Sequence, residues 1–304
     1  MSADSPPVDA ITISSADGST TATFIPSANL VCSALRYRGA DWFDPVRAEE
    51  AAPSGKDYGI SLVHPWAGRL ARFGYNAAGR EVSLSAEDDQ LPHDKHGLPI
   101  HGVWDRLLQW EVEKSAEQQL LAHLSWTDAH LLEVFPFPHE LRLMASIKTA
   151  ELRLEIELHP TGDVGVPVAF GYHAFLRIPD SPRSEWTMIL GARERLLLGE
   201  NLIPDGTTAP LTGREFVLGE LGVEEDVTGF DSPARLAFGD GKAAVSMELD
   251  EGFSVAHLFA PAGRDLVSFE PMTAPANALN SGDGLRIVEP GQTFRTSFAI
   301  QLPG

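Results

Sequence analysis

Four short segments of the sequence combine a potentially reactive side chain with turn residues or aromatic residues. They begin at His64 (HPWAGRLARFGY), His96 (HGLPIHGVWDR), Pro167 (PVAFGYHAFLRIP) and Ser268 (SFEPMTAPANALN). Turns on a rigid scaffold are where proteins often present catalytic and binding groups. We therefore take these four segments as the parts of a candidate site.

Glu270 and His173 are the candidates for proton transfer. Glu270 follows an apolar run (LVSF) and precedes Pro271, so we expect its carboxylate beside an apolar wall, a setting that suits a general base. His173 lies in an aromatic run (FGYHAF), and an imidazole, which titrates near neutrality, could act as a general acid. A salt-bridged glutamate at a strand end and a core histidine fit the same local patterns.

Three further residues could bind a ligand. His101 precedes Gly102, which allows a ligand to approach closely, and its ring could hydrogen-bond a hydroxylated ligand. Arg69 could make forked hydrogen bonds to neighbouring hydroxyls or to a carboxylate. Asp226 is the least distinctive candidate, and Asp231 could fill the same role.

The sequence gives little support for a metal site. His93, His96 and His101 form a loose cluster (HDKHGLPIH) without helical spacing or a clear further ligand. Cys32 is the only cysteine, so neither an intrachain disulfide nor a thiolate cage can form. We expect no bound metal.

The charge balance narrows the choice of partners. The 304 residues include 23 Lys and Arg against 43 Asp and Glu, a net charge of −20. Such a surface repels nucleic acid and acidic membranes, so we expect neither as a partner. The N-terminus has no basic stretch followed by an apolar run, and no apolar segment approaches the length of a membrane span. A cytoplasmic location is the expectation.

The frequent glycines and prolines and the alternation of apolar residues favour strands. The 27 glycines and 22 prolines leave little room for long helices, and residues 47–52 are the clearest helical candidate. Apolar residues alternate along 141–147 and 152–158, which predicts a hairpin. Alternation along 245–249 resumes after Asp250-Glu251-Gly252, which predicts a second hairpin, and 294–302 reads as a half-buried final strand.

These elements must position the four candidate segments. No linker or repeat marks a boundary, so residues 1–304 are expected to form a single domain. We predict an all-β chain in which two large sheets pack against each other.

The four segments, in this order, resemble the aldose 1-epimerase (galactose mutarotase) family across nearly the whole chain. Residues 68–70 (GRL) are similar to the family's Asn-Arg-Ile motif, and 100–103 (IHGV) to its Leu-His-Gly-Gly motif. The family's second histidine motif is matched by 171–175 (GYHAF). The strongest match is 270–280 (EPMTAPANALN), which is followed by 285–291 with its Glu-Pro-Gly.

The resemblance implies a large antiparallel β-sandwich with a site on an open concave face. It implies His173 as the general acid, Glu270 as the general base, His101 and Arg69 as substrate-binding residues, and Asp226 as a further binding residue. The chain departs from the family pattern at three positions. Gly68 replaces the asparagine of the first motif, Val103 replaces the second glycine of the next motif, and Ala174 replaces a larger residue after the second histidine. These changes bear on specificity more than on the reaction.

The resulting hypothesis is an isomerase of carbohydrate metabolism that interconverts the α and β anomers of a hexose without a cofactor, acting as a monomer or homodimer. Because the two oxygens that lose and gain protons are bonded to one sugar carbon, the polar atoms of His173 and Glu270 should lie roughly 4 to 8 Å apart, with His101 and Arg69 on the same wall. Three alternatives remain: an epimerase of a phosphosugar or sulfosugar with arginines near the motifs as an anion pocket, a non-catalytic sugar-binding protein, and a glycoside hydrolase, which would need two carboxylates. The arginines in question are Arg72, Arg106 and Arg177.

Overall fold

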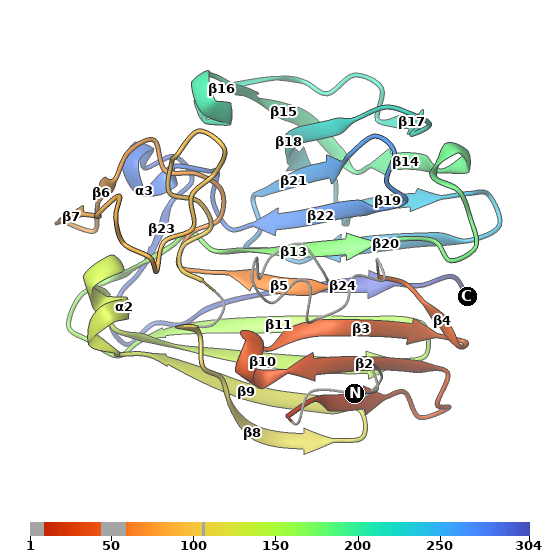
Figure 1. The fold of residues 1–304 in the computed structure, drawn as a ribbon, viewed down its shortest axis with the longest axis horizontal. Helices are drawn as coiled ribbons and strands as arrows, with labels where there is room; N and C mark the ends of the chain where they lie inside the picture. Colours follow the sequence, from red (N-terminus) through yellow and green to blue (C-terminus); the bar gives the residue numbers. More distant parts are fainter. Residues whose placement is uncertain (1–8, 44–58, 105–106) are drawn as a thin grey trace.

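The computed structural model describes residues 9–43, 59–104 and 107–304. In these residues the chain is built mainly from antiparallel strands. Two large sheets, of 11 and 9 strands as far as the structure describes them, lie one over the other with their strands in the same general direction (Figure 1). This is the aligned packing of a β-sandwich, so the predicted fold class is confirmed.

The first sheet brings together candidate segments that lie far apart in the sequence. Its central strands, β5, β13, β22, β21 and β18, are neighbours although the chain visits them in a different order. From edge to edge the strands are β1 (Ile11–Ser14), β2 (Thr20–Ile25), β3 (Val31–Tyr37), β5 (Ile60–Val63), β13 (Gly171–Leu176), β22 (Val267–Met272), β21 (Val255–Ala260), β18 (Val223–Phe230), β15 (Ala192–Leu198) and β16 (Pro204–Pro210), with β4 (Ala40–Asp41) beside β3.

The second sheet closes the other side of the core. Its strands are β17 (Glu215–Val217), β14 (Thr187–Leu190), β19 (Ala234–Gly239), β20 (Ala244–Leu249), β24 (Phe294–Gln301), β11 (Glu151–Pro160), β10 (His139–Lys148), β9 (Gln119–Trp126) and β8 (Glu111–Ala116). Two short pairs complete the strands: β12 (Val166–Val168) with β23 (Arg286–Val288), and β6 (Gly74–Ala77) with β7 (Arg80–Ser83).

Helices are a minor component, as predicted. In the described residues they are α2 (Ala129–Val134), α3 (Ala278–Ser281) and the 3-10 turns η1 (Pro26–Ala28), η3 (Arg183–Glu185) and η4 (Glu200–Leu202). The helical candidate at 47–52 lies outside the described residues. Nowhere in the described part of the chain does a helix combine the length and apolar character that a membrane crossing requires.

The alternating pattern predicted one hairpin correctly. β10 and β11 pair in register from His139 opposite Pro160 to Lys148 opposite Glu151. Leu141, Leu143 and their alternate neighbours on both strands are buried, because one face of this sheet packs on the core. The predicted final strand is present as β24 beside β11, but it is more buried than predicted: six of its eight residues are buried, because it lies between β20 and β11 inside the second sheet.

The second predicted hairpin is wrong. β20 pairs with β19 and β24 in the second sheet, whereas β21 pairs with β18 and β22 in the first, so the turn at 250–252 carries the chain across the core. A hairpin and a crossing have the same alternation, because the inward residues of both strands are buried in either case. The neighbours of Asp250 decide between them: its backbone N–H donates to the Ser297 carbonyl at 3.0 Å, which keeps this end of β20 against β24.

Candidate active site

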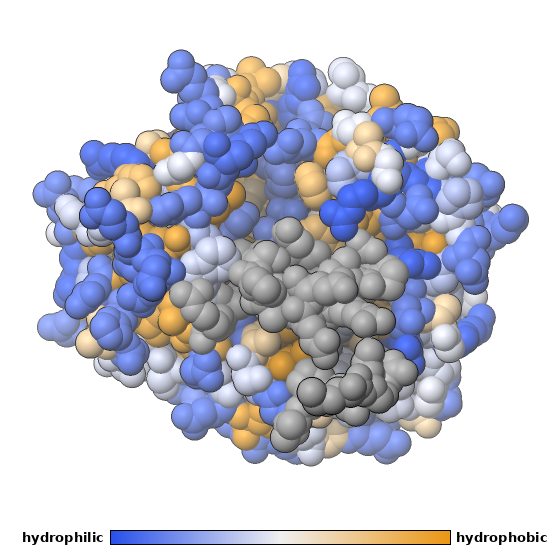
Figure 2. All heavy atoms as spheres, in the orientation of Figure 1, coloured by the Kyte–Doolittle hydropathy of each residue, from blue (hydrophilic) through white to orange (hydrophobic). Residues whose placement is uncertain are grey.

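A pocket of about 170 Å³ lies over the centre of the first sheet. It is lined by side chains of β13, β18, β21 and β22 and by the loops that follow β5 and precede β8. In Figure 2 the surface is hollowed over β21 and β22, and hydrophilic residues surround the hollow. This volume is below the roughly 300–1,000 Å³ of drug-sized ligand sites, so the pocket suits a ligand of about one sugar ring.

Strand alternation decides which side chains reach the pocket. His173 and Phe175 on β13 line it. Tyr172 also borders it, but the Tyr172 ring packs on Phe298 in the core, with 5.1 Å between ring centroids. Glu270 on β22 lines the pocket in the same way, and its neighbour Phe269 is fully buried. Successive side chains of a strand point to opposite faces, so each strand contributes every second residue.

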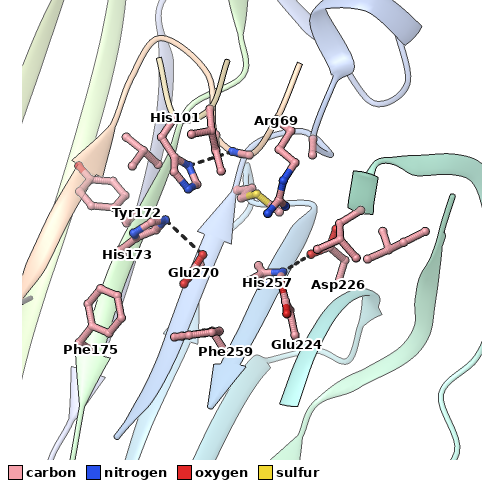
Figure 3. Close-up of a pocket in the computed structure, with 18 residues that line it drawn as sticks. Arg69, His101, Tyr172, His173, Phe175, Glu224, Asp226, His257, Phe259 and Glu270 are labelled. Carbon is pink, nitrogen blue, oxygen red and sulfur yellow. Dashed lines mark hydrogen bonds and ion pairs between the residues drawn. The ribbon is translucent and has the colours of Figure 1, made fainter. Parts of the chain in front are cut away.

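His173 and Glu270 meet on the floor of the pocket. Gly171 pairs with Met272 and Ala174 with Phe269, so the register sets His173 opposite Glu270. His173 Nε2 lies 3.2 Å from Glu270 Oε2, and the two residues are only 6% and 7% exposed (Figure 3). The pair converges as predicted, although the separation is shorter than the expected 4 to 8 Å because the two groups contact each other directly.

His101 stands over His173. Its ring makes an edge contact with the His173 ring, with 4.5 Å between centroids. The backbone N–H of Gly68 donates to His101 Nδ1 at 3.1 Å, and the His101 N–H donates to the Gly68 carbonyl at 2.9 Å. A neutral imidazole that accepts at Nδ1 carries its proton on Nε2, so His101 presents a hydrogen-bond donor.

The glycine that replaces the family's asparagine at position 68 is required by its surroundings. Gly68 has φ +69°, and a Cβ at this position would come within 2.6 Å of the Ala276 Cβ. Ala276 belongs to the segment that follows Glu270, and it lines the pocket as well. The close approach of these two loops therefore depends on the missing side chain.

Arg69 reaches into the pocket from the loop after β5 (Figure 3). Its Nε donates to Asp94 Oδ2 at 2.6 Å, and Asp94 also accepts from the backbone N–H groups of His96 and Leu98. Burial by itself raises the pKa of Asp94, but these hydrogen bonds outweigh burial and hold the pKa below its usual value. Asp94 thus holds the arginine by one edge, which leaves the terminal nitrogens for a ligand.

Asp226 lines the pocket, whereas Asp231 does not. Asp231 lies beyond the end of β18 and pairs with Arg193 and Arg214. Asp226 Oδ1 lies 2.6 Å from Nδ1 of His257, a β21 residue that also lines the pocket and that sequence reasoning missed. The available signal was parity, because His257 lies two residues from Val255 along the alternating strand.

His257 carries a proton at neutral pH. Burial lowers its pKa, but the hydrogen bond to Asp226 and the negative charges of Glu270, Asp226 and Glu224 outweigh burial and raise the pKa to about 9. Glu224, a second β18 residue in the pocket, was also missed by sequence reasoning.

Several sequence candidates lie elsewhere. His64 is in the core, where its Nε2 lies 2.9 Å from Nε2 of His139. His93 and His96 are exposed and do not line the pocket. Among the described residues no group of three or more His, Cys, Asp or Glu side chains could hold a metal ion.

The proposed anion-binding groups also differ from expectation. Trp66 and Phe269, the large aromatic residues beside the motifs, are buried in the core, whereas Phe175 and Phe259 line the pocket. Arg72 and Arg177 do not line the pocket. The third arginine of that hypothesis, at position 106, lies outside the described residues.

Solved structures share this architecture. The Slr1438 protein from Synechocystis sp. PCC 6803 is 23% identical with a TM-score of 0.80, covering 99% of this chain and 96% of that one. A galactose mutarotase-like protein from Clostridium acetobutylicum is 14% identical with a TM-score of 0.83, covering 97% and 95%. The GalM/aldose epimerase homologue from C. elegans is 15% identical with a TM-score of 0.78, covering 96% and 98%. At these identities the likeness concerns the fold.

Family membership rests on the sequence. No curated protein matches the chain. The family model for aldose 1-epimerase matches residues 47–301, which include all four segments of the site. The chain therefore belongs to the aldose 1-epimerase family.

Proposed function

We propose that this protein is an aldose 1-epimerase that interconverts the anomers of a neutral hexose. The observation that carries the proposal is the contact of 3.2 Å between His173 Nε2 and Glu270 Oε2 at the base of a pocket the size of a sugar ring. A potential acid and a potential base lie within reach of two oxygens bonded to one carbon.

Ring opening needs one base and one acid. Glu270, as a carboxylate, takes the proton of the anomeric hydroxyl, while His173, as an imidazolium, protonates the ring oxygen. The bond between the anomeric carbon and the ring oxygen breaks, and an open-chain aldehyde forms. Each positioned proton transfer contributes on the order of 10² to 10⁴ in rate.

Ring closure reverses both transfers on the other face of the aldehyde. The carbonyl group rotates, His173 takes back the proton of the ring hydroxyl as it attacks, and Glu270 returns its proton to the former carbonyl oxygen. Both residues regain their starting protonation and no electrons are gained or lost. The reaction therefore requires neither a redox cofactor nor a metal.

His101 and Arg69 are positioned to orient the sugar. His101 offers an N–H donor above His173, and the terminal nitrogens of Arg69 offer further donors. Asp226 also lines the pocket and offers an acceptor for a sugar hydroxyl. Holding the ring in this way raises the rate because the reacting oxygens stay beside the acid and the base.

The charges of the pocket favour a neutral sugar. In the described part of the chain, three carboxylates face the pocket, Glu224, Asp226 and Glu270, against the basic groups Arg69, His257 and, in its acid form, His173. These charges balance, so the pocket offers no excess of positive charge to a phosphate or sulfonate. Arg72 and Arg177, which would have supported an anionic substrate, do not line the pocket.

The direct test is anomer exchange measured by polarimetry or NMR, starting from a pure anomer. The panel contains neutral hexoses, a hexose 6-phosphate and a 6-sulfonated hexose. We expect catalysis with a neutral hexose, and a loss of at least about 10²-fold in kcat for Glu270→Gln and for His173→Asn, because each removes one proton-transfer partner.

A matched control uses a histidine and glutamate pair on the outer face of the second sheet. His159 Nε2 lies 2.9 Å from Glu157 Oε2, and neither residue lines the pocket. His159→Asn and Glu157→Gln should leave kcat unchanged. Near-normal exchange in either site variant contradicts the mechanism, and saturable sugar binding without exchange in the wild type favours the non-catalytic alternative.

A further inference from the structure

Polar residues form a row across adjacent strands on the floor of the pocket. Asp226 on β18 is the register partner of His257 on β21, and His257 is the register partner of Glu270 on β22. Directly opposed residues of antiparallel strands have Cβ atoms about 4.5 to 5.5 Å apart on the same face. Glu270 therefore lies between two histidines, His173 on one side and His257 on the other (Figure 3).

The three histidines of the pocket have different hydrogen-bond partners. His101 accepts at Nδ1 from the Gly68 N–H, and His173 contacts Glu270 itself. His257 lies 2.6 Å from a second carboxylate, that of Asp226, which is 4% exposed. An ionised carboxylate only accepts hydrogen bonds, so His257 Nδ1 donates in this contact.

This arrangement suits a permanent charge better than a proton shuttle. A group that exchanges protons in each turnover works best when its pKa lies near the working pH. The pKa of His257, raised to about 9 by Asp226 and its acidic neighbours against the effect of burial, lies well above neutrality. The proton on His257 therefore stays in place while the pair of His173 and Glu270 turns over.

We propose that His257, held by Asp226, is a positioning residue whose fixed positive charge keeps Glu270 in the carboxylate form and extends the working range of the site to lower pH. This inference rests on the proposed function in one respect, the role of Glu270 as base. A simple structural pair of Asp226 and His257 would stabilise the sheet without affecting that base.

The other charges around Glu270 must be considered with it. The titratable groups that face it come from β13, β18, β21 and the two loops: His173, Glu224, Asp226, His257, Arg69 and His101. Glu224 and Asp226 place negative charge in the pocket with Glu270, whereas Arg69 and His257 place positive charge there. Of the two cations, His257 is the one directly opposite Glu270 in the sheet.

The first experiment is the pH dependence of kcat/KM for the wild type and His257→Asn. Asparagine retains a donor near the place of Nδ1 but carries no charge. A unit charge about 5 Å away, at an effective dielectric constant between about 20 and 80, predicts an upward shift of the acidic limb by about 0.6 to 2.4 pH units. At alkaline pH the variant should approach the wild-type rate. His159→Asn, which removes a surface histidine of a similar pair, should leave the profile unchanged.

An acidic limb at the same pH in wild type and His257→Asn overturns the proposal, because a merely structural pair would lower the rate at all pH values alike. The second measurement needs no sugar and no variant: NMR of the ¹⁵N-labelled histidine rings of the wild type. His257 should remain an imidazolium at pH 7.5, and a neutral ring at this pH also overturns the proposal.

The two measurements separate this inference from the proposed function. If the wild type exchanges no sugar anomers, the proposed function fails, while ¹³C NMR of the Glu270 carboxyl still reads the charge effect. We then expect Glu270 to protonate at a pH higher by about 0.6 to 2.4 units in His257→Asn than in the wild type. Unchanged Glu270 titration contradicts the role of His257 whatever the activity.

Discussion

Acid should destabilise this protein through a pair of buried histidines beneath the site. His64 and His139 are 1% and 0% exposed, and their Nε2 atoms lie 2.9 Å apart among Trp126, Phe135 and Phe170. His139 Nδ1 lies 2.6 Å from the carbonyl oxygen of residue 137, so this nitrogen donates and Nε2 of the neutral ring accepts from His64. His64 Nδ1 has no hydrogen-bond partner among the described residues.

The sign and size of the effect follow from the shifted pKa values. Burial lowers the pKa of His139 to about 4, and burial together with the nearby His139 lowers that of His64 well below its usual value. Folded-state pKa values below the unfolded value of about 6.5 mean that stability is fully present above that pH and is lost as pH falls. At pH 5, His139 alone should cost about 2 kcal/mol of the free energy of unfolding, and the pair up to about 4 kcal/mol.

The assay is urea unfolding at pH 7.5, 6 and 5. The wild type is compared with the double variant His64→Gln, His139→Gln, in which neither buried side chain titrates, and with His130→Gln, which removes an exposed histidine. We expect the loss of stability between pH 7.5 and 5 to be smaller by about 2 to 4 kcal/mol in the double variant and unchanged in the His130 variant. An equal loss in wild type and double variant would refute the reasoning.

Three further outcomes are expected. Because the pKa of His257 is raised to about 9, its contribution to the free energy of unfolding is fully present below pH 6.5 and falls as pH rises. Urea unfolding should show that the free energy of unfolding decreases by about 2 kcal/mol by pH 8 in the wild type, and that this decrease is absent from His257→Asn. Gly68→Ala should lower both stability and kcat/KM, because the added Cβ meets Ala276. The control Gly79→Ala, at a similar φ of +75° with no atom within 4 Å of the added Cβ, should show only the backbone cost of about 1 kcal/mol. Equal unfolding midpoints of the two variants contradict the steric role of position 68. Asp94→Asn should raise KM about tenfold with little change in kcat, because the hydrogen bond that orients Arg69 weakens. Steady-state kinetics with a neutral hexose measure both constants. A lower kcat at unchanged KM would argue against a role of Asp94 in orienting Arg69.

The sequence by itself determined the class of fold and predicted which residue types would meet at the site. Strict alternation along 141–158 identified the β10 and β11 hairpin, because a half-buried strand must place apolar residues on every second position. The residue types of His173 and Glu270, in segments that resemble a known family, predicted an acid and a base, and the structure places the two side chains in contact.

Only the tertiary structure decided which residues share the pocket. His257 and Asp226 are 31 positions apart, and they meet because β18 and β21 pair in one particular register. Asp226 and Asp231 are equivalent in local sequence, and only the paired part of β18 turns the first toward the pocket. The turn at 250–252 could join partners within a sheet or cross between sheets, and contacts with β24, far away in the chain, select the crossing. Local patterns report burial, whereas strand order and register depend on the packing of the whole chain.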